Sequence, residues 1–88
     1  MRGGDIMKIN TLIDELKNKR KEIYNKYYDE ELGFKNISIE TYKELDSFIL
    51  NVLHEYDNCF CTEEEDVDFE YNLVLLEMDR AKLYSMVK

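Results

Sequence analysis

Two carboxylates, those of Glu44 and Asp46, flank Leu45 in the middle of the chain. If this segment is helical and Leu45 lies on its buried stripe, Asp46 sits at the edge of the buried seam and Glu44 points away from it. A carboxylate at such an edge is partly desolvated, so it can face a docked protein while keeping its charge. The alternative is an ordinary solvated carboxylate that pairs with Lys43 or Arg20. Asp46 is therefore the first candidate for a functional residue.

The segment that carries these acids is predicted to be a helix that begins after Ser38, a side chain suited to N-capping. Glu40 adds a negative charge to its first turn, where the helix dipole favours it. Apolar residues recur at spacings of three and four, which is typical of a helix with one buried face. They are Tyr42, Leu45, Ile49, Val52 and Tyr56, with Phe48 and Leu53 widening the face.

A similar stripe runs through the preceding segment, a predicted helix over residues 8–32. Its members are Ile9, Ile13, Leu16, Arg20, Ile23 and Tyr27. We expect Gly33 to end this helix in the left-handed conformation. Two helices joined by about five residues must run antiparallel. The two stripes are then expected to face each other, which places Arg20 near Ile49.

Arg20 is the one charged residue in the stripe of this first helix. In one interpretation its guanidinium pairs with Asp46 across the hairpin and fixes that carboxylate. In the other, its alkyl stem lies on the seam while its charged end reaches water. The residue types leave both interpretations open.

A third helix is predicted over residues 66–88, after a loop from residue 57 to residue 65. It has two apolar stripes: Val67, Tyr71, Val74, Met78 and Ala81 form one, and Leu73, Leu76, Leu83 and Val87 form the other. A helix that is apolar on two sides needs two neighbours. It can pack along the hairpin or pair with a second copy of itself. We favour an all-α fold in which it completes a small three-helix bundle.

Size and composition agree with a single helical domain over residues 1–88, with the hairpin at 8–57. A chain of 88 residues that is 44% hydrophobic and 36% charged suits a thin core under a large solvated surface. Its net charge of −8 argues against binding to nucleic acid or to an anionic membrane. No apolar run approaches the roughly 18 residues of a membrane span, and no signal peptide is recognisable. We expect a cytoplasmic protein.

The remaining candidate sites are weaker. His54, Cys59 and Cys61 lack the four-ligand spacing of a structural zinc site, so we expect no metal and two reduced thiols. Residues 1–6 are expected to be disordered, because the amphipathic pattern starts only after Met7. We also expect translation to start at Met7 rather than Met1, because the preceding Arg-Gly-Gly-Asp can be encoded by a purine-rich, ribosome-binding-like stretch.

The run Lys43-Glu44-Leu45-Asp46, eleven residues after Leu32-Gly33, resembles the signature of the Spo-zero-E family. These proteins are small aspartyl-phosphate phosphatases of spore-forming Gram-positive bacteria. Their signature reads Ser-Gln-Glu-Leu-Asp and lies on the second helix of a helical hairpin. The first predicted helix is also similar to theirs, and the resemblance covers residues 8–57. The matching positions of that helix are Ile13, Leu16, Arg20 and Ile23.

The resemblance implies that the chain removes the phosphoryl group from the aspartyl phosphate of a response regulator that commits cells to sporulation. The regulator already holds Mg²⁺ and a lysine around its phosphoryl group. The helper protein therefore needs no cofactor of its own and has only to place a water molecule in line. Asp46 matches the essential acid of the family, which positions or partly deprotonates that water. Glu44 is the other matched acid, with a role in docking or helix support.

Two positions depart from the family signature: Tyr42 stands where the family has serine, and Lys43 stands where it has glutamine. A phenol at Tyr42 can fill the seam, and Lys43 can contact a phosphoryl oxygen or an acidic rim of the partner. These departures keep two other functions open. One is a non-catalytic helical interaction module that binds a regulator or forms a homodimer. The other is an acidic inhibitor, of the phage or plasmid type, that covers a basic protein surface.

Overall fold

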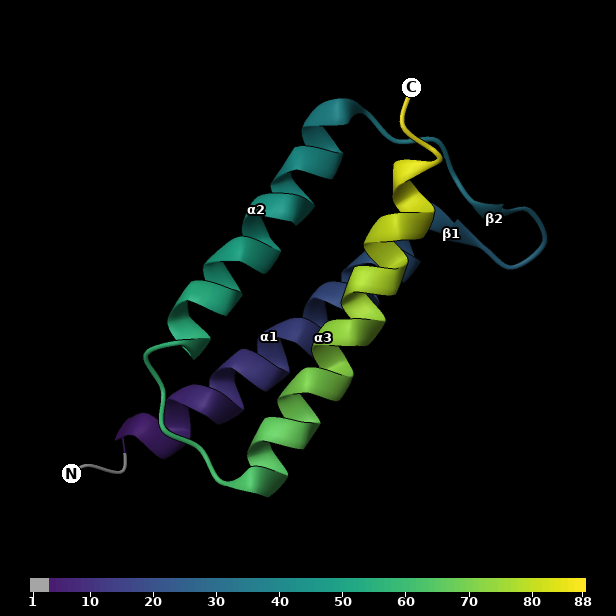
Figure 1. The fold of residues 1–88 in the computed structure, drawn as a ribbon. Coiled ribbons are helices and arrows are strands. Elements are labelled where there is room, and N and C mark those ends of the chain that lie inside the picture. Colours follow the sequence, from purple (N-terminus) through teal and green to yellow (C-terminus); the bar gives the residue numbers. More distant parts are fainter. Residues whose placement is uncertain (1–3) are drawn as a thin grey trace.

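The computed structural model describes the backbone of residues 4–88 and the side chains of residues 9–88. It contains three helices: α1 (Gly4–Tyr27), α2 (Ile39–Tyr56) and α3 (Glu63–Tyr84). α2 runs antiparallel to α1, and α3 returns in the direction of α1 (Figure 1). The predicted three-helix bundle is therefore confirmed. No helix in the part of the chain that the structure describes is long and apolar enough to cross a membrane.

α1 starts at Gly4, earlier than the predicted residue 8. Residues 4–6, which were expected to be disordered, therefore belong to this helix, and the same expectation for residues 1–3 lies outside the described residues.

The core is built largely from the helical stripes that the spacing predicts, but it also contains Leu12 and Phe69, which belong to none of them. α1 contributes Ile9, Leu12, Ile13, Leu16 and Ile23, α2 contributes Leu45, Ile49 and Val52, and α3 contributes Phe69, Leu76 and Leu83. α1 packs more closely against α3 than against α2, and α3 lies in front of α1 in Figure 1. The stripes of α1 and α2, which were expected to face each other, both contribute to this core, but α1 has α3 rather than α2 as its closer neighbour. Three helices can bury all three stripes in one core, which a two-helix hairpin cannot do.

α3 turns one of its two predicted apolar stripes toward this core. Leu76 and Leu83 are buried, whereas the other stripe, which includes Val74 and Met78, is more than half exposed. The buried face of α3 also carries two polar residues, Asn72 and Asp79. The expectation of two covered faces is thus not met within the described chain.

The connection between α1 and α2 differs from the prediction. α1 ends at Tyr27, and a two-stranded antiparallel sheet follows, β1 (Tyr28–Asp29) paired with β2 (Gly33–Phe34). Gly33 does adopt a positive φ of 82°, but it closes this hairpin and does not cap a helix. A three-residue hairpin loop requires a residue in the left-handed region at this place, and glycine adopts it without a steric cost.

Side chains and ring contacts stabilise this early end of α1. The Asp29 carboxylate accepts hydrogen bonds from the backbone N–H groups of Glu31 and Leu32, at 2.8 and 3.0 Å. Such bonds compete with continuation of a helix. The rings of Tyr24, Tyr28 and Phe34 have centroids 5.0 to 5.4 Å apart. This aromatic cluster holds the hairpin against the end of α1.

The starts of α2 and α3 are capped by side chains. Ser38 accepts a hydrogen bond from the Thr41 N–H, as predicted. Thr62 and Glu65 form a reciprocal capping box, so α3 begins at Glu63, three residues before the predicted start.

The C-terminal tail pairs with the segment before α2. The Ile37 N–H donates to the Met86 carbonyl at 3.0 Å, and the Lys88 N–H donates to the Ile37 carbonyl at 3.1 Å. This short parallel bridge ties the C-terminal end of α3 to the α1–α2 connection.

Candidate functional site

Asp46 lies on α2 with its side chain 45% exposed. Its Oδ1 accepts a hydrogen bond from Nη1 of Arg80, on α3, at 2.7 Å. Among the described residues this is the one hydrogen bond or ion pair of Asp46, so Oδ2 remains open to solvent or to a partner. The carboxylate is thus displayed at the junction of α2 and α3, held from one side. Sequence reasoning did not identify Arg80 as its neighbour.

The matched motif is divided between two faces of α2. Tyr42 lies one turn before Asp46 and packs against Tyr84 of α3, with ring centroids 5.4 Å apart. Lys43 and Glu44 are exposed and lie toward α1. Residues two apart on a helix project about 200° from each other, so Glu44 and Asp46 cannot serve one small site together. Any partner that contacts Asp46 approaches from the α2–α3 side.

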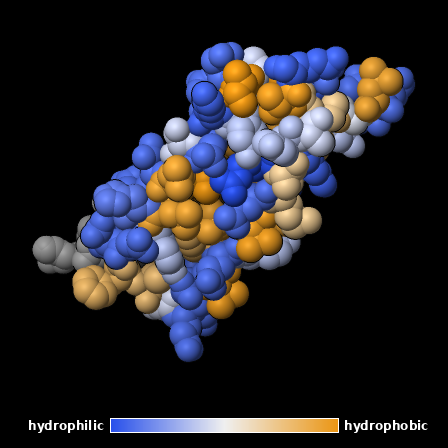
Figure 2. All heavy atoms as spheres, turned by 45° about the horizontal axis from the view of Figure 1, so that its top comes forward, coloured by the Kyte–Doolittle hydropathy of each residue, from blue (hydrophilic) through white to orange (hydrophobic). Residues whose placement is uncertain are grey.

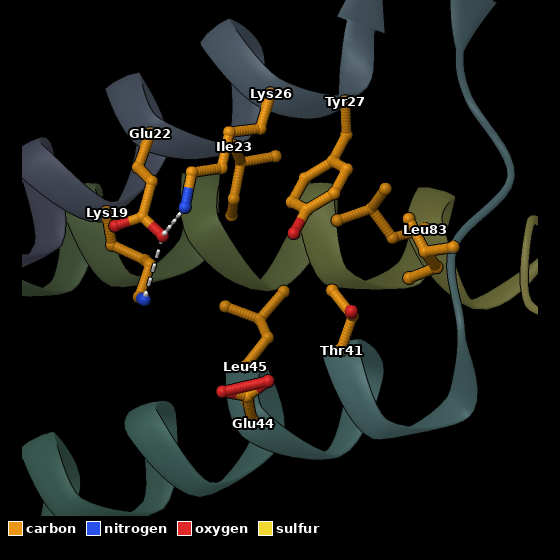
Figure 3. Close-up of a pocket in the computed structure, with 10 residues that line it drawn as sticks. Lys19, Glu22, Ile23, Lys26, Tyr27, Thr41, Glu44, Leu45 and Leu83 are labelled. Atoms are coloured by element: carbon orange, nitrogen blue, oxygen red, sulfur yellow. Dashed lines mark hydrogen bonds and ion pairs between the residues drawn. The ribbon is translucent and has the colours of Figure 1, made fainter.

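Glu44 borders a cleft of about 120 Å³ between α1 and α2. Figure 3 shows Thr41, Glu44 and Leu45 entering from α2, opposite Ile23 and Tyr27 of α1. The Tyr27 hydroxyl points into this space (Figure 3). Apolar side chains, including Leu45 and Leu83, form its floor. The cleft is too small for a drug-sized ligand, since such pockets usually measure about 300–1,000 Å³.

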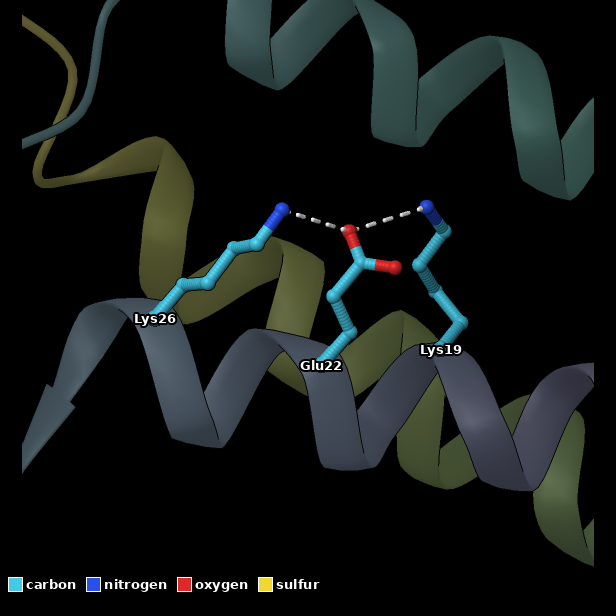
Figure 4. Close-up of polar contacts among 3 residues, drawn as sticks. All are labelled: Lys19, Glu22 and Lys26. Atoms are coloured by element: carbon cyan, nitrogen blue, oxygen red, sulfur yellow. Dashed lines mark hydrogen bonds and ion pairs between the residues drawn. The ribbon is translucent and has the colours of Figure 1, made fainter.

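The rim of this cleft on α1 carries a charge network centred on Glu22. Its Oε2 lies 3.5 Å from Lys26 Nζ and 3.7 Å from Lys19 Nζ, as Figure 4 shows. Lys19 Nζ also lies 4.9 Å from the ring centroid of Phe48 on α2. These are helix pairs at spacings of three and four, with side chains between 24% and 60% exposed. Such pairs stabilise a helix slightly and are screened by salt. They line the cleft without forming a catalytic pair.

Arg20 does not pair with Asp46, so that interpretation is wrong. Its Nε donates to Oδ2 of Asp79 at 2.7 Å, and the Tyr24 hydroxyl donates to Oδ1 of the same carboxylate at 3.1 Å. Asp79 is 1% exposed. Because a buried carboxylate needs a charged partner, Arg20 is drawn to Asp79 on α3 and not to the half-exposed Asp46 on α2. The alternative, an arginine whose charged end reaches water, is met in part, because the Arg20 side chain is 29% exposed while its Nε is bound to Asp79.

The Asp79 charge changes the titration of its two donors. The hydrogen bond to Asp79 raises the pKa of Arg20 above its ordinary value, which keeps the guanidinium charged. Burial first, and then the Asp79 charge, raise the pKa of the Tyr24 phenol. This triad joins α1 to α3 and is structural, because it faces the core.

The signal that could have revealed Asp79 lay in the spacing of α3. The buried positions Phe69, Asn72, Leu76, Asp79 and Leu83 recur at intervals of three and four, so Asp79 belongs to the buried face. An arginine in the facing stripe of α1 predicts an acidic partner on this face of α3.

The described residues offer no site of their own for a metal. No three His, Cys, Asp or Glu side chains in this part of the chain are grouped so that they could hold an ion. Cys59 donates to the Glu55 carbonyl at 3.3 Å, and both Cys59 and Cys61 are partly buried. Chemically, the arrangement presents one oriented carboxylate on a stable helix face. That suits work on a partner that brings its own reactive group.

Comparison of the sequence with protein-family models and with curated proteins, and of the fold with solved structures, found no significant match.

Proposed function

We propose that the chain is a Spo-zero-E-like phosphatase that hydrolyses the aspartyl phosphate of a response regulator. The observation that supports this most is the position of Asp46. The residue that matches the acid of the family signature is 45% exposed at a helix edge, with one oxygen held and the other open. A carboxylate sealed beneath α3 would have left a docking protein no route to it.

The reaction needs little from the helper protein. The attacking water forms a bond to phosphorus while the bond to the regulator's aspartyl oxygen breaks, which yields inorganic phosphate and a free aspartate. The partner's Mg²⁺ and lysine neutralise the phosphoryl oxygens, and the lone pair of Asp46 Oδ2 orients the water and accepts its proton. Positioning of this kind supplies a large part of the rate enhancement in phosphoryl transfer.

Arg80 is the residue of α3 with a part in this proposal. By binding Oδ1 it limits rotation of the Asp46 carboxylate and leaves Oδ2 without a hydrogen bond from the described residues. An ion pair with side chains 26% and 45% exposed contributes about 1 kcal/mol or less to stability, so docking can rearrange it without unfolding the bundle. Arg80 is thus a positioning residue.

The second candidate function is binding of the regulator without hydrolysis of its aspartyl phosphate. The packing of Tyr42 on Tyr84 favours it, because the position where the family has a small serine is occupied by a ring contact between α2 and α3. The two candidates differ in stoichiometry. A phosphatase acts in trace amounts, whereas a binder requires about one chain per regulator.

The test uses a sporulation response regulator with a radiolabelled aspartyl phosphate. The intact chain at a small fraction of the regulator concentration should release labelled phosphate. Asp46→Ala should lower the rate by at least about 100-fold, because it removes the group that orients the water. Glu40→Ala is the matched control and should keep the wild-type rate, since it removes an exposed carboxylate from the same helix, six residues before Asp46.

Circular dichroism should show unchanged helix in both variants, because each side chain is largely solvated. Full turnover by Asp46→Ala would overturn the assignment of the site.

A further inference from the structure

An apolar stripe on the outer face of α3 has no neighbour in the described part of the chain. We call Val67, Tyr71, Val74 and Met78 the outer stripe. Each is between 51% and 65% exposed, and their spacing of four, three and four matches a heptad seam. Figure 2 shows hydrophobic side chains, in orange and beige, emerging among hydrophilic ones on this side of the molecule. A line of apolar side chains along a helix marks a protein interface.

Other exposed apolar residues do not form such a line. Leu32 lies in the loop of the β-hairpin, Leu50 on the outer face of α2 and Phe60 in the loop before α3. Scattered residues of this kind are normal on a protein surface. The outer stripe differs because it follows the length of one helix, at the spacing that another helix can match.

The charges along α3 identify the occupant that fits. Residues 63–73 include six acids and no base, whereas residues 74–88 include three bases and two acids. Of these, the acid Asp79 is buried and paired with Arg20, and the base Arg80 is paired with Asp46. Glu77, Lys82 and Lys88 remain, so this half still carries more positive than negative free charge. In a parallel pair of α3 helices, the six acids of one copy would therefore lie beside the six acids of the other. An antiparallel second copy sets the acidic half against the more basic half.

The flanks of the outer stripe repeat this complementarity in detail. The seam continues past Met78 to Ala81, which is also exposed. An antiparallel register that sets Tyr71 opposite Ala81 and Val74 opposite Met78 brings Asp68 and Lys82, both exposed, to the same side of the seam. In an antiparallel pair of helices, equivalent flanking positions face each other. Asp68 of one copy then lies beside Lys82 of the other, twice by symmetry.

We propose that two copies of the chain associate through antiparallel α3 helices, with the outer stripe as the seam. The interface is isologous, because the same stripe serves both copies. Four half-exposed side chains offer on the order of 400 Å² of apolar area per chain, about half of a standard interface. The dimer is therefore weak and depends on concentration. It uses no residue of the Asp46 site and is independent of the proposed phosphatase function.

Sedimentation equilibrium of the full chain tests this proposal. The mass should rise from 10.6 kDa toward twice that value as the concentration increases from about 10 µM to about 1 mM. Val74→Asp, at the centre of the stripe, should hold the mass at 10.6 kDa while circular dichroism shows intact helix. Leu50→Asp is the matched control, since Leu50 is 58% exposed on α2, and it should dimerise as the wild type does.

A mass of 10.6 kDa at every concentration would overturn the proposal and assign the stripe to a different protein. Unchanged dimerisation of Val74→Asp, or loss of dimerisation in Leu50→Asp, would overturn it as well.

A charge exchange tests the antiparallel orientation. Lys82→Glu places two like-charged pairs at the seam and should weaken the dimer about tenfold. The double variant Asp68→Lys/Lys82→Glu exchanges the charges and should restore most of the affinity, because each copy again meets an opposite charge. A double variant that dimerises no better than Lys82→Glu would exclude the antiparallel arrangement.

Discussion

Asp79 is a carboxylate that the fold buries almost completely, and it is retained there because Arg20 and Tyr24 both donate to it. Asp46 also pairs with an arginine at 2.7 Å, but its side chain is 45% exposed. The two pairs have the same chemistry and differ in solvation. Solvation decides how much each contributes to stability, because removal of one partner from a buried pair leaves an uncompensated charge.

Arg20→Ala should therefore lower the free energy of unfolding by about 3 kcal/mol, since it leaves the Asp79 carboxylate buried without its cation. Arg80→Ala is the matched control and should cost less than about 1 kcal/mol, since Asp46 can turn to water. Urea denaturation measures both. Equal costs for the two variants would contradict the distinction between a buried and an exposed pair.

Deprotonation of Tyr24 should lower the free energy of unfolding at alkaline pH. Its pKa is raised by burial and by the Asp79 charge, so the folded state holds the phenol proton more tightly than the unfolded state. The corresponding stability is fully present below the ordinary pKa of 10.0 and is lost as pH rises through the raised value.

Tyr24→Phe has no proton to lose at this position. Its unfolding free energy should fall less between pH 9 and about pH 11 than that of the wild type. Thermal unfolding at a series of pH values measures this, and parallel pH profiles would contradict the assignment.

At the scale of the elements, the positions of the helices follow from hydrophobic spacing, but their mutual packing does not. The stripes of α1 and α2 are buried as predicted because apolar residues recur there with little interruption. On α3 the two stripes look equally apolar, and the face that is actually buried includes Asn72 and Asp79. The local apolar pattern cannot show which of these two faces is buried, because the answer depends on Arg20, a residue on another helix.

The end of α1 was mispredicted for a related reason. Nothing in the apolar spacing distinguishes a helix that continues to Leu32 from one that stops at Tyr27. The outcome depends on Asp29, which binds two backbone N–H groups, and on rings that meet only in the folded chain. These hydrogen bonds also lower the pKa of Asp29.

Gly33→Ala should test the hairpin directly. Nothing lies within 4 Å of a Cβ placed at Gly33, so the cost of the substitution comes from the positive φ alone. We expect a loss of about 1 kcal/mol in unfolding free energy. Gly33→Asn should lose less, because asparagine tolerates this conformation. If chemical denaturation showed no loss for alanine, the left-handed conformation of Gly33 would be wrong.

At the scale of the whole molecule, the three helices bury one core, and two of the surfaces that they leave exposed are the candidate sites for partners. One is the junction of α2 and α3, where Asp46 is held by Arg80. The other is the outer stripe of α3. The candidate acid was identified from the sequence because it lies beside a stripe residue, Leu45. Its hydrogen bond to Arg80 could not be predicted in the same way, because Arg80 lies on the third helix, 34 residues later in the chain.

The number of phosphate ions released per chain tests the central claim most directly. Purified chain is mixed with a large excess of labelled phospho-regulator, and released phosphate is counted as the pool is consumed. A phosphatase built around Asp46 should release many phosphates per chain, until the excess is exhausted. Release that stops at one phosphate per chain, or that does not exceed the regulator's own spontaneous loss, would contradict the proposed function.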